Sequence, residues 1–327
     1  MKINSALILK NTHPINKERF LQIADFNKLD IFEKASDLIE KKINILYCSD
    51  SLDIRAILTL IFRVKSNKIF FHALEMYSIS FKALMSEIKL KITNVFKLRS
   101  IYLISIWIIK FVLIKFLLKF NKHKIIISSF SRKKYLMSNY NSYDILVSPN
   151  YPLSQNFNGS NTLERFDDFQ DIIKNKYFYL PGNIHNLKEF KELSILLAKM
   201  KLNVVLTSSK KIPEYLKNDN ILETGKLNKN QIFYLIKNSV GGIALFDKRS
   251  VNQNLCASSK LYEFLFFNKS VIVSDVHEIN ELMKSKLKFN LFFKDQINES
   301  LLRNRFFNSS NNYNYEYTHE KNLINLL

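Results

Sequence analysis

Four polar residues that stand close together, Ser258, Ser259, Lys260 and Glu263, offer the most specific chemistry in this sequence. A serine can cap a helix, and the free N–H groups of the first turn, together with a lysine, form a positive site suited to a diphosphate. Glu263, about one turn further on, can accept two hydrogen bonds from a ribose diol. The same residues would also cap and solubilise an ordinary helix, so spacing alone leaves both interpretations open.

The chain around these residues alternates between short apolar runs and helix-length periodic segments, which is typical of α/β proteins with parallel sheets. The strands that we expect are 5–11, 43–49, 68–74, 124–129 and 145–150 in the first half, and 176–182, 202–209, 221–225, 241–247 and 270–275 in the second. Helices are expected between them, including 187–200, 228–238 and 260–267. The paired serines therefore open a helix that leads to a buried strand.

The length of 327 residues exceeds the size at which one hydrophobic core stops growing, so two domains are expected. A polar stretch at 150–162, which contains Pro152 and Gly159 with several Asn and Ser, predicts the linker between them. We therefore place a first domain at 1–150 and a second at 151–311.

The stretch NLCASSKLYEFLFFNKSVIVSDVHEINEL, residues 254–282, resembles the SPNKLYEYLA-G-PVIASD-PEI-EL segment of bacterial glycosyltransferase family 4 (glycosyl transferases group 1). Further segments resemble this family in the expected order: LYCSDSLDIRAILTL (46–60), FFHALEMYS (70–78), YLPGNI (179–184), ILETGKLNKNQIFYLIKNSVGGIALF (221–246) and YNYEYTHEKNL (313–323). The resemblance covers most of the chain and is densest from 177 to 282.

This resemblance implies a GT-B fold, in which two Rossmann-like parallel-sheet domains face a cleft. The first domain would bind the acceptor and the second the nucleotide sugar, while 312–327 would form a closing helix that packs back toward the first domain. In the family, the Lys and Glu of the 254–282 segment line the sugar-nucleotide pocket, which implies this role for Lys260 and Glu263.

The family's glycine loop adds three candidates for binding the nucleotide sugar. Gly182 and Asn183 match the loop itself, and Lys188 is the nearest cation after it that could hold the diphosphate. The chain departs from the family at Leu255, where a second glutamate usually stands eight positions before Glu263; the serine-lysine form of this loop is a known variation.

The candidates in the first half are histidines and one carboxylate. His72 and Glu75, at the end of an expected strand, are catalytic candidates that would make polar contacts to acceptor or sugar, and strand-end packing is the alternative for both. His13, after the first strand, is a comparable candidate. His185 and His277 are expected to be exposed loop residues.

The small numbers of glycines and cysteines exclude several other classes of protein. Five glycines in the whole chain leave no glycine-rich dinucleotide fingerprint and no P-loop. Cys48 and Cys256 stand far apart, so the sequence indicates neither a disulfide framework nor a zinc site. Because no D-x-D motif occurs either, we expect a metal-independent enzyme without a cofactor.

The formal charge of +20 is concentrated in residues 81–140, where thirteen Lys and Arg stand against one acid. This segment contains IYLISIWIIKFVLIKFLLKF (101–120), which is long enough to cross a bilayer but is interrupted by lysines. Lys115, Lys119 and Lys122 fall within about 60° of one another on a helical wheel, which predicts a helix lying on an anionic membrane surface. A buried domain helix and a true span are the alternatives, and nucleic-acid binding is disfavoured because the apolar residues are large and nearly continuous.

Together these features predict a glycosyltransferase that moves a sugar from a nucleotide-sugar donor to a lipid-linked (polyprenol-linked) or cell-surface polysaccharide acceptor. Capsule or lipopolysaccharide assembly in a bacterium would be the setting, and the expected location is cytoplasmic, peripheral on the inner face of the cell membrane. Two alternatives remain open: a GT-B-fold sugar-nucleotide 2-epimerase, and a non-catalytic membrane scaffold derived from a transferase.

Overall fold

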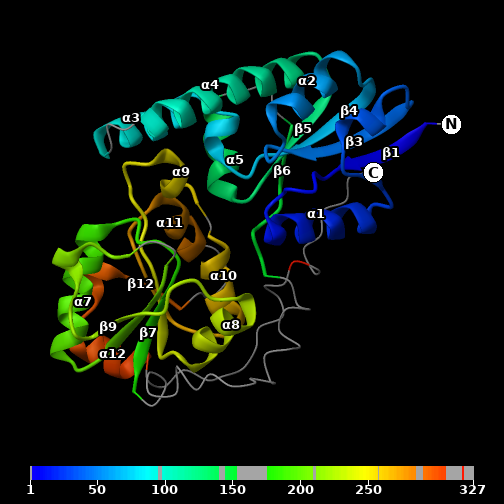
Figure 1. The fold of residues 1–327 in the computed structure, drawn as a ribbon. Coiled ribbons are helices and arrows are strands. Elements are labelled where there is room, and N and C mark those ends of the chain that lie inside the picture. The colour runs from blue at the N-terminus through cyan, green and yellow to red at the C-terminus, as the bar shows by residue number, and fades with distance from the viewer. Residues whose placement is uncertain are drawn as a thin grey trace. The chain divides into compact units, whose positions relative to one another are not determined.

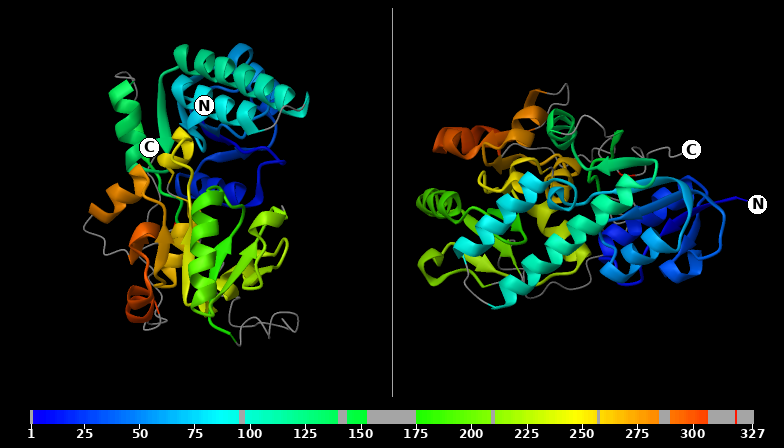
Figure 2. Two further views of the ribbon diagram at one scale, coloured as in Figure 1. Left: turned by 90° about the vertical axis from the view of Figure 1, so that its left-hand side faces the viewer. Right: turned by 90° about the horizontal axis from the view of Figure 1, so that it is seen from above.

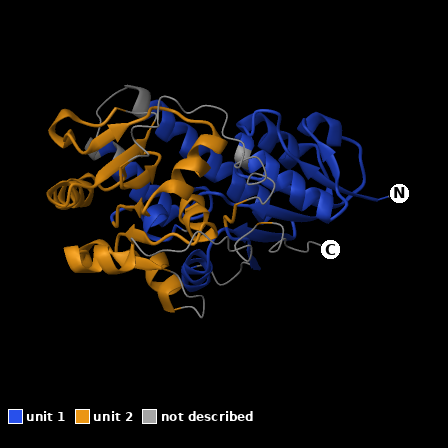
Figure 3. Ribbon diagram, turned by 90° about the horizontal axis from the view of Figure 1, so that it is seen from below, with its two compact units in different colours: residues 1–149, 249–256, 322–327 blue, residues 150–248, 257–321 orange. Residues whose placement is uncertain are grey.

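The structure is a computed structural model, and it describes residues 2–94, 98–139, 144–152, 175–208, 211–256, 258–284, 290–306 and 319. The chain forms two compact units (Figure 3). The first contains residues up to 149 together with 249–256, and the second contains 150–248 and the described residues from 258 onward. Most of the predicted linker and of the predicted closing helix at 312–327 lies outside the described residues.

The first unit is built on a parallel sheet whose six described strands have the order β2-β1-β3-β4-β5-β6 (Figure 1). The strands are β1 (Ile3–Leu7), β2 (Asp30–Phe32), β3 (Ile43–Ser49), β4 (Ser66–His72), β5 (His123–Ile127) and β6 (Ile145–Val147). The helices are α1 (Pro14–Phe26), α2 (Ile54–Phe62), α3 (Phe81–Asn94), α4 (Leu98–Lys119), α5 (Phe130–Asn139) and α9 (Val251–Asn254), with short 3₁₀ turns η1 (Ala35–Leu38) and η2 (Met76–Ser78).

The second unit repeats this plan with the strand order β12-β11-β10-β7-β8-β9. The strands are β7 (Tyr177–Pro181), β8 (Asn203–Thr207), β9 (Ile221–Glu223), β10 (Gly241–Ala244), β11 (Val271–Val273) and β12 (Leu291–Phe293). The helices are α7 (Leu187–Lys199), α8 (Lys229–Asn238), α10 (Ser259–Phe266), α11 (His277–Lys284) and α12 (Glu299–Arg305), with 3₁₀ turns η5 (Glu214–Leu216) and η6 (Lys294–Gln296). Counted from β7, this is the classical Rossmann order.

Buried apolar residues cover both faces of each sheet, as expected for parallel strands that helices cover on both sides. In the first unit, Cys48 and Phe71 belong to the core on one face, whereas Tyr47 and Phe70 belong to the core on the other, because neighbouring residues of a strand point to opposite faces. The predicted α/β class with two Rossmann-like parallel sheets is therefore confirmed.

Two features of the chain path bear on function. In the first unit, α3 and α4 contact each other along one side of the sheet (Figures 1 and 2). Residues 249–256, which the sequence placed within the second domain, belong to the first unit. Leu255 is part of its core, and the Ser129 hydroxyl donates a hydrogen bond to the Leu255 carbonyl at 3.0 Å.

Candidate functional site

The candidate site of the second unit lies where the strand order reverses. The first strand β7 pairs on one side with β8 and on the other with β10, so the crevice between β7 and β10 is the topological switch point at which α/β sheets bind ligands. A hollow of about 50 Å³ opens at the carboxyl ends of these two strands, and Ser258 and Lys260 of the following segment line it together with Pro181, Asn183 and Phe246.

The helix α10 begins at this hollow because its first turn is capped. Ser258 has an extended backbone, and its hydroxyl accepts a hydrogen bond from the Lys260 N–H at 3.3 Å. Ser259 is the first helical residue. The helix packs closely on β10, since a Cβ on Gly242 would lie 2.6 Å from the Phe264 ring. Ser258 is therefore the N-cap of α10, and the start of this helix lies beside the carboxyl end of β7, where Lys260 lines the hollow.

Lys260 and Gly182 are in direct contact in the hollow. Gly182 has φ +92°, a backbone conformation that residues with a side chain rarely adopt. A Cβ added there would lie 1.7 Å from Lys260 Nζ. The glycine therefore supplies both the turn after β7 and the space for the ammonium group. Burial lowers the pKa of Lys260, and the negative charge of Glu263 opposes this shift.

Glu263 is only 8% exposed and lies on the inner side of α10. Besides acting on Lys260, its charge adds to the effect of burial in raising the pKa of Tyr179, whose hydroxyl donates a hydrogen bond to Thr207 at 2.8 Å. A buried carboxylate one turn from a buried ammonium balances its charge, which is required for burying either group. Charge balance and recognition of ligand hydroxyl groups are both compatible with this position.

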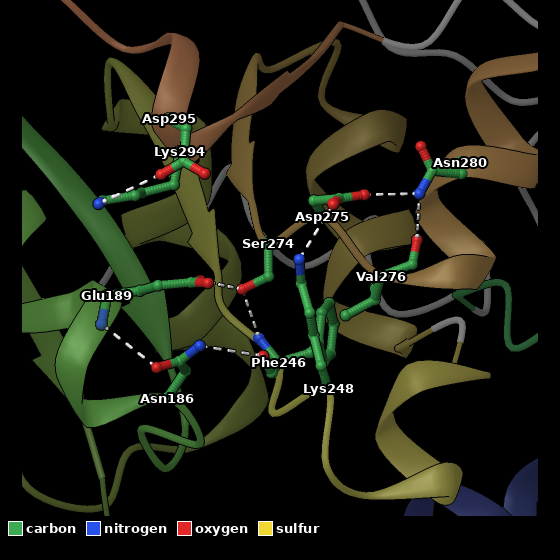
Figure 4. A network of polar contacts seen from close by, with 10 residues as sticks. All are labelled: Asn186, Glu189, Phe246, Lys248, Ser274, Asp275, Val276, Asn280, Lys294 and Asp295. Atoms are coloured by element: carbon green, nitrogen blue, oxygen red, sulfur yellow. Dashed lines mark hydrogen bonds and ion pairs between the residues drawn. The ribbon is translucent and has the colours of Figure 1, made fainter.

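A polar network fixes the loop that follows β10 (Figure 4). The Ser274 hydroxyl donates a hydrogen bond to Glu189 and accepts one from the Phe246 N–H at 3.0 Å. Asn186 caps α7 and donates to the Phe246 carbonyl at 3.3 Å. Glu189 and Ser274 were not among the residues predicted for the site, although Ser274 stands in the SVIVSD run (270–275), whose resemblance to the family could have indicated it.

The other residues predicted for this site are more exposed. Asn183 lies at the rim and accepts a hydrogen bond from the Ser208 hydroxyl at 2.8 Å. Lys188, in the first turn of α7, is exposed and is not among the residues that line the hollow. His185 lines the hollow and is exposed, and His277 is the exposed first residue of α11.

The candidates of the first unit differ in burial: His72, at the end of β4, is buried, whereas Glu75, beyond the strand, is partly exposed. His72 is 4% exposed, and its Nδ1 lies 2.8 Å from the Tyr47 hydroxyl and its ring beside Phe20, which is the strand-end packing given above as the alternative. Glu75 lies beyond the strand and is partly exposed, and its Oε2 accepts a hydrogen bond from Asn252 at 2.6 Å. His13 is exposed before α1.

No protein-family model matches the sequence, and no curated protein matches it. Solved structures do match. A UDP-forming α,α-trehalose-phosphate synthase from Burkholderia xenovorans superposes with a TM-score of 0.48 at 9% identity, over 86% of this chain and 69% of that one. A UDP-GlcNAc 2-epimerase from Methanocaldococcus jannaschii superposes with a TM-score of 0.44 at 11% identity, over 95% of this chain and 81% of that one. HepE from Anabaena, in complex with UDP-glucose, superposes with a TM-score of 0.45 at 9% identity, over 84% of this chain and 75% of that one. Structural similarity at this level of identity does not indicate an activity, and membership of glycosyltransferase family 4 stays a prediction.

Proposed function

We propose that the chain is a glycosyltransferase that binds a nucleotide sugar at the hollow of the second unit and transfers its sugar to a lipid-linked or cell-surface glycan. The observation that carries this proposal is the arrangement of Lys260 beside Gly182, at the capped start of α10 and at the switch point of a Rossmann-ordered sheet. The sequence resemblance around residues 254–282 supports it.

The chemistry assigned to these residues follows from their charge and position. A diphosphate at the start of α10 would meet free N–H groups, the positive end of the helix dipole and the Lys260 ammonium, which together would stabilise it as the leaving group. Glu263 would accept hydrogen bonds from ribose hydroxyls. Because about 50 Å³ is far below the ~300 Å³ of small-molecule sites, the hollow would hold only a phosphate group beside the Lys260 ammonium, and the rest of the nucleotide sugar would lie outside it.

A thermal-shift panel of UDP, GDP and ADP tests the proposal. We expect one nucleotide to raise the melting temperature, because a ligand at about 100 times its Kd stabilises the folded state by about 2.7 kcal/mol. Lys260→Met should abolish this response, and Lys199→Met, at an exposed lysine near the end of α7, should retain it. A response lost in Lys188→Met instead would assign the diphosphate to the lysine that the family pattern indicated.

Product analysis separates the transferase from its alternatives. The protein is incubated with sugar derivatives of the nucleotide that stabilises it. Free nucleoside diphosphate should form only when an acceptor is present. An epimerised nucleotide sugar formed without acceptor would identify the 2-epimerase, and binding without turnover of any donor would identify the scaffold.

We further propose that α4 attaches the protein to an anionic membrane surface. Residues Ile101–Lys119 have a mean hydropathy of 2.3 and are long and apolar enough to cross a membrane, but one face of α4 packs in the core of the first unit through Ile114 and Leu117. The opposite face exposes Ile101, Ile108, Ile109, Val112 and Phe116. A helix that packs on protein along one face and exposes apolar groups along the other suits the membrane interface.

The lysines at the end of α4 differ in exposure. Lys119, the last residue of α4, and Lys122, just beyond it, are exposed, whereas Lys115 lies over the Phe111 ring and burial lowers its pKa to about 8. Flotation with vesicles that contain phosphatidylglycerol should recover the protein, and Lys119→Gln with Lys122→Gln should weaken recovery, whereas Lys199→Gln should not. Equal recovery with purely zwitterionic vesicles would contradict the electrostatic part of the proposal.

A further inference from the structure

A second hollow, of about 290 Å³, lies entirely within the first unit. It forms where the carboxyl ends of β3 and β4 meet, because these strands are parallel neighbours with Ser49 opposite His72. The segments that follow the two strands supply one wall, including Asp50 and Glu75, and α4 supplies the other, including Trp107 and Lys110.

Polar groups of both kinds face this hollow. Asn252 binds one oxygen of Glu75, and no described residue donates to the other oxygen, Oε1. Lys110 donates to the Asp50 carbonyl at 2.8 Å, which among the described contacts uses one of its three donors. The Asp50 carboxylate is held by the Glu75 N–H at 3.0 Å. The hollow thus presents fixed acceptors and a fixed donor side by side.

The remaining wall is aromatic and aliphatic. Tyr77 and Trp107 are stacked with ring centroids 4.9 Å apart and an interplanar angle of 23°. Phe111 and Ile114 continue this surface along α4. A ligand in the hollow would therefore lie with one side on apolar surface and with its edges against Glu75 and Lys110.

We propose that this hollow binds one hydroxyl-rich ring, a pyranose unit. Each sugar hydroxyl both donates and accepts, which suits carboxylates beside an ammonium group, and the C–H face of a pyranose packs on aromatic rings. Asp50 and Glu75 disfavour an anionic ligand, and the Lys110 ammonium beside them offsets part of their attraction for a cation. The volume is at the lower limit of ligand sites, which have ~300 to 1,000 Å³, and accommodates a single sugar rather than a nucleotide sugar.

The environment of Asp50 agrees with this assignment. Burial raises the pKa of Asp50 to about 6, although the Glu75 N–H and the Lys110 charge favour the ionised form. At neutral pH the carboxylate is therefore mainly charged but poorly solvated, and a hydroxyl donor would replace hydration that the protein withholds. The proposal rests on the proposed transferase function for its role, because the bound unit would be the sugar that receives the transferred one.

Trp107 allows a direct test, since it is the only tryptophan in the chain and lies in the wall of the hollow. Its fluorescence is followed during titration of the full-length protein with the methyl glycosides of glucose, galactose, mannose and N-acetylglucosamine. We expect a saturable change with at least one of them, and none with sodium phosphate or tetramethylammonium chloride. If the octyl glycoside of the same sugar binds more tightly than the methyl glycoside, the bound unit belongs to a lipid-linked acceptor. If the two bind equally, it belongs to a lipid-free acceptor. Either result supports the site.

Two variants locate the binding. Glu75→Gln keeps the shape of the side chain but removes its charge, and should weaken binding of the sugar by about tenfold. Tyr77→Phe keeps the stacked ring and removes only the hydroxyl, so it should bind measurably less tightly while remaining folded by circular dichroism. Asp25→Asn, at an exposed carboxylate of α1, is the matched control and should bind normally.

The absence of a saturable response to every sugar, or full affinity in both Glu75→Gln and Tyr77→Phe, would overturn the assignment. A response to phosphate would also overturn it. This result is independent of the nucleotide panel, because Trp107 belongs to the first unit and the nucleotide site to the second. A protein that binds nucleotide but no sugar here would keep the donor site and lose only this inference.

Discussion

At the scale of single residues, the second unit depends on a glycine and a lysine that occupy one space. Gly182 accepts a left-handed backbone at φ +92°, and the Lys260 ammonium fills the volume that its missing Cβ leaves. Another glycine, Gly225, has φ +69° but no atom within 4 Å of the position of a Cβ. A substitution at Gly225 therefore strains only the backbone, whereas the same substitution at Gly182 strains the backbone and also displaces Lys260.

Alanine at either glycine should cost similar stability but have different effects on binding. We expect Gly182→Ala and Gly225→Ala each to lower the free energy of unfolding by about 1 to 2 kcal/mol, because both force alanine to a positive φ. Only Gly182→Ala should also remove the nucleotide response, since its Cβ displaces the end of the flexible Lys260 side chain. Urea unfolding and the nucleotide melting assay measure the two effects, and unchanged nucleotide binding in Gly182→Ala would contradict the site.

Asp50 predicts a pH-dependent stability. Its pKa is raised by burial to about 6, above the unfolded value, so its favourable contribution is complete below the unfolded pKa and is lost as pH rises through about 6. Asp50→Asn does not titrate. The free energy of unfolding of this variant relative to the native chain should therefore increase by about 1 to 1.5 kcal/mol between about pH 5 and pH 7.5.

Urea unfolding of both proteins at the two pH values checks this prediction. All other ionisable groups are common to both proteins, so the difference between them reports on Asp50. A difference that stays constant with pH would show that the carboxylate is well solvated, and this would weaken the case for the hollow that it lines.

At the scale of elements, α4 has one buried and one exposed apolar face. Its inner face carries Trp107 and Lys110 toward the hollow and buries Ile114, while its outer face exposes Val112 at 56%. The repeated apolar residues of this helix are thus divided between the protein and the proposed lipid surface. This division is the pattern expected of a helix that lies at a membrane interface.

A single-tryptophan comparison tests the orientation of α4. Trp107→Phe with Val112→Trp places the sole tryptophan on the outer face, and native Trp107 serves as the inner-face control. With vesicles of brominated phosphatidylglycerol and phosphatidylcholine, we expect the emission at position 112 to shift to the blue and to be quenched several-fold more than that of Trp107. Equal quenching at both positions would indicate a span, and none at either would remove the membrane proposal.

At the scale of the whole molecule, the chain leaves the second unit after Lys248 and contributes residues 249–256 to the first. Asn252 is the centre of this insertion. Its side-chain oxygen accepts from the Met76 N–H and from the Arg132 guanidinium, both at 3.0 Å, and its amide donates to Glu75. Because Arg132 is 1% exposed, the loss of this acceptor would leave buried donors without a partner.

Asn252→Ala should therefore destabilise the first unit by about 1 to 3 kcal/mol. Thermal unfolding followed by Trp107 fluorescence reports this unit alone, whereas far-ultraviolet circular dichroism reports both units. We expect the variant to unfold at a lower temperature by fluorescence. Asn186→Ala, which removes the cap of α7 in the second unit, should change the dichroism transition and leave the fluorescence one nearly unchanged. An unshifted fluorescence transition in Asn252→Ala would show that the insertion adds no stability.

Local pattern was sufficient to predict the α/β class, the two sheets and the capped helix at Ser258. Strand alternation and apolar runs depend on neighbouring residues, and helix caps depend on residues a few positions apart, so both are visible in a single chain. Lys260 was indicated by its place beside the paired serines, and Gly182 by the family resemblance.

Only the tertiary structure decided which of these residues meet. It placed Lys260 against Gly182 and left Lys188 exposed, packed His72 into the core, and joined Asp50 and Glu75 of neighbouring strands with Lys110 of α4 in one hollow. It also assigned residues 249–256 to the first unit. Contacts of this kind depend on strand order and on the face to which each side chain points, and both are set by packing between segments far apart in the sequence.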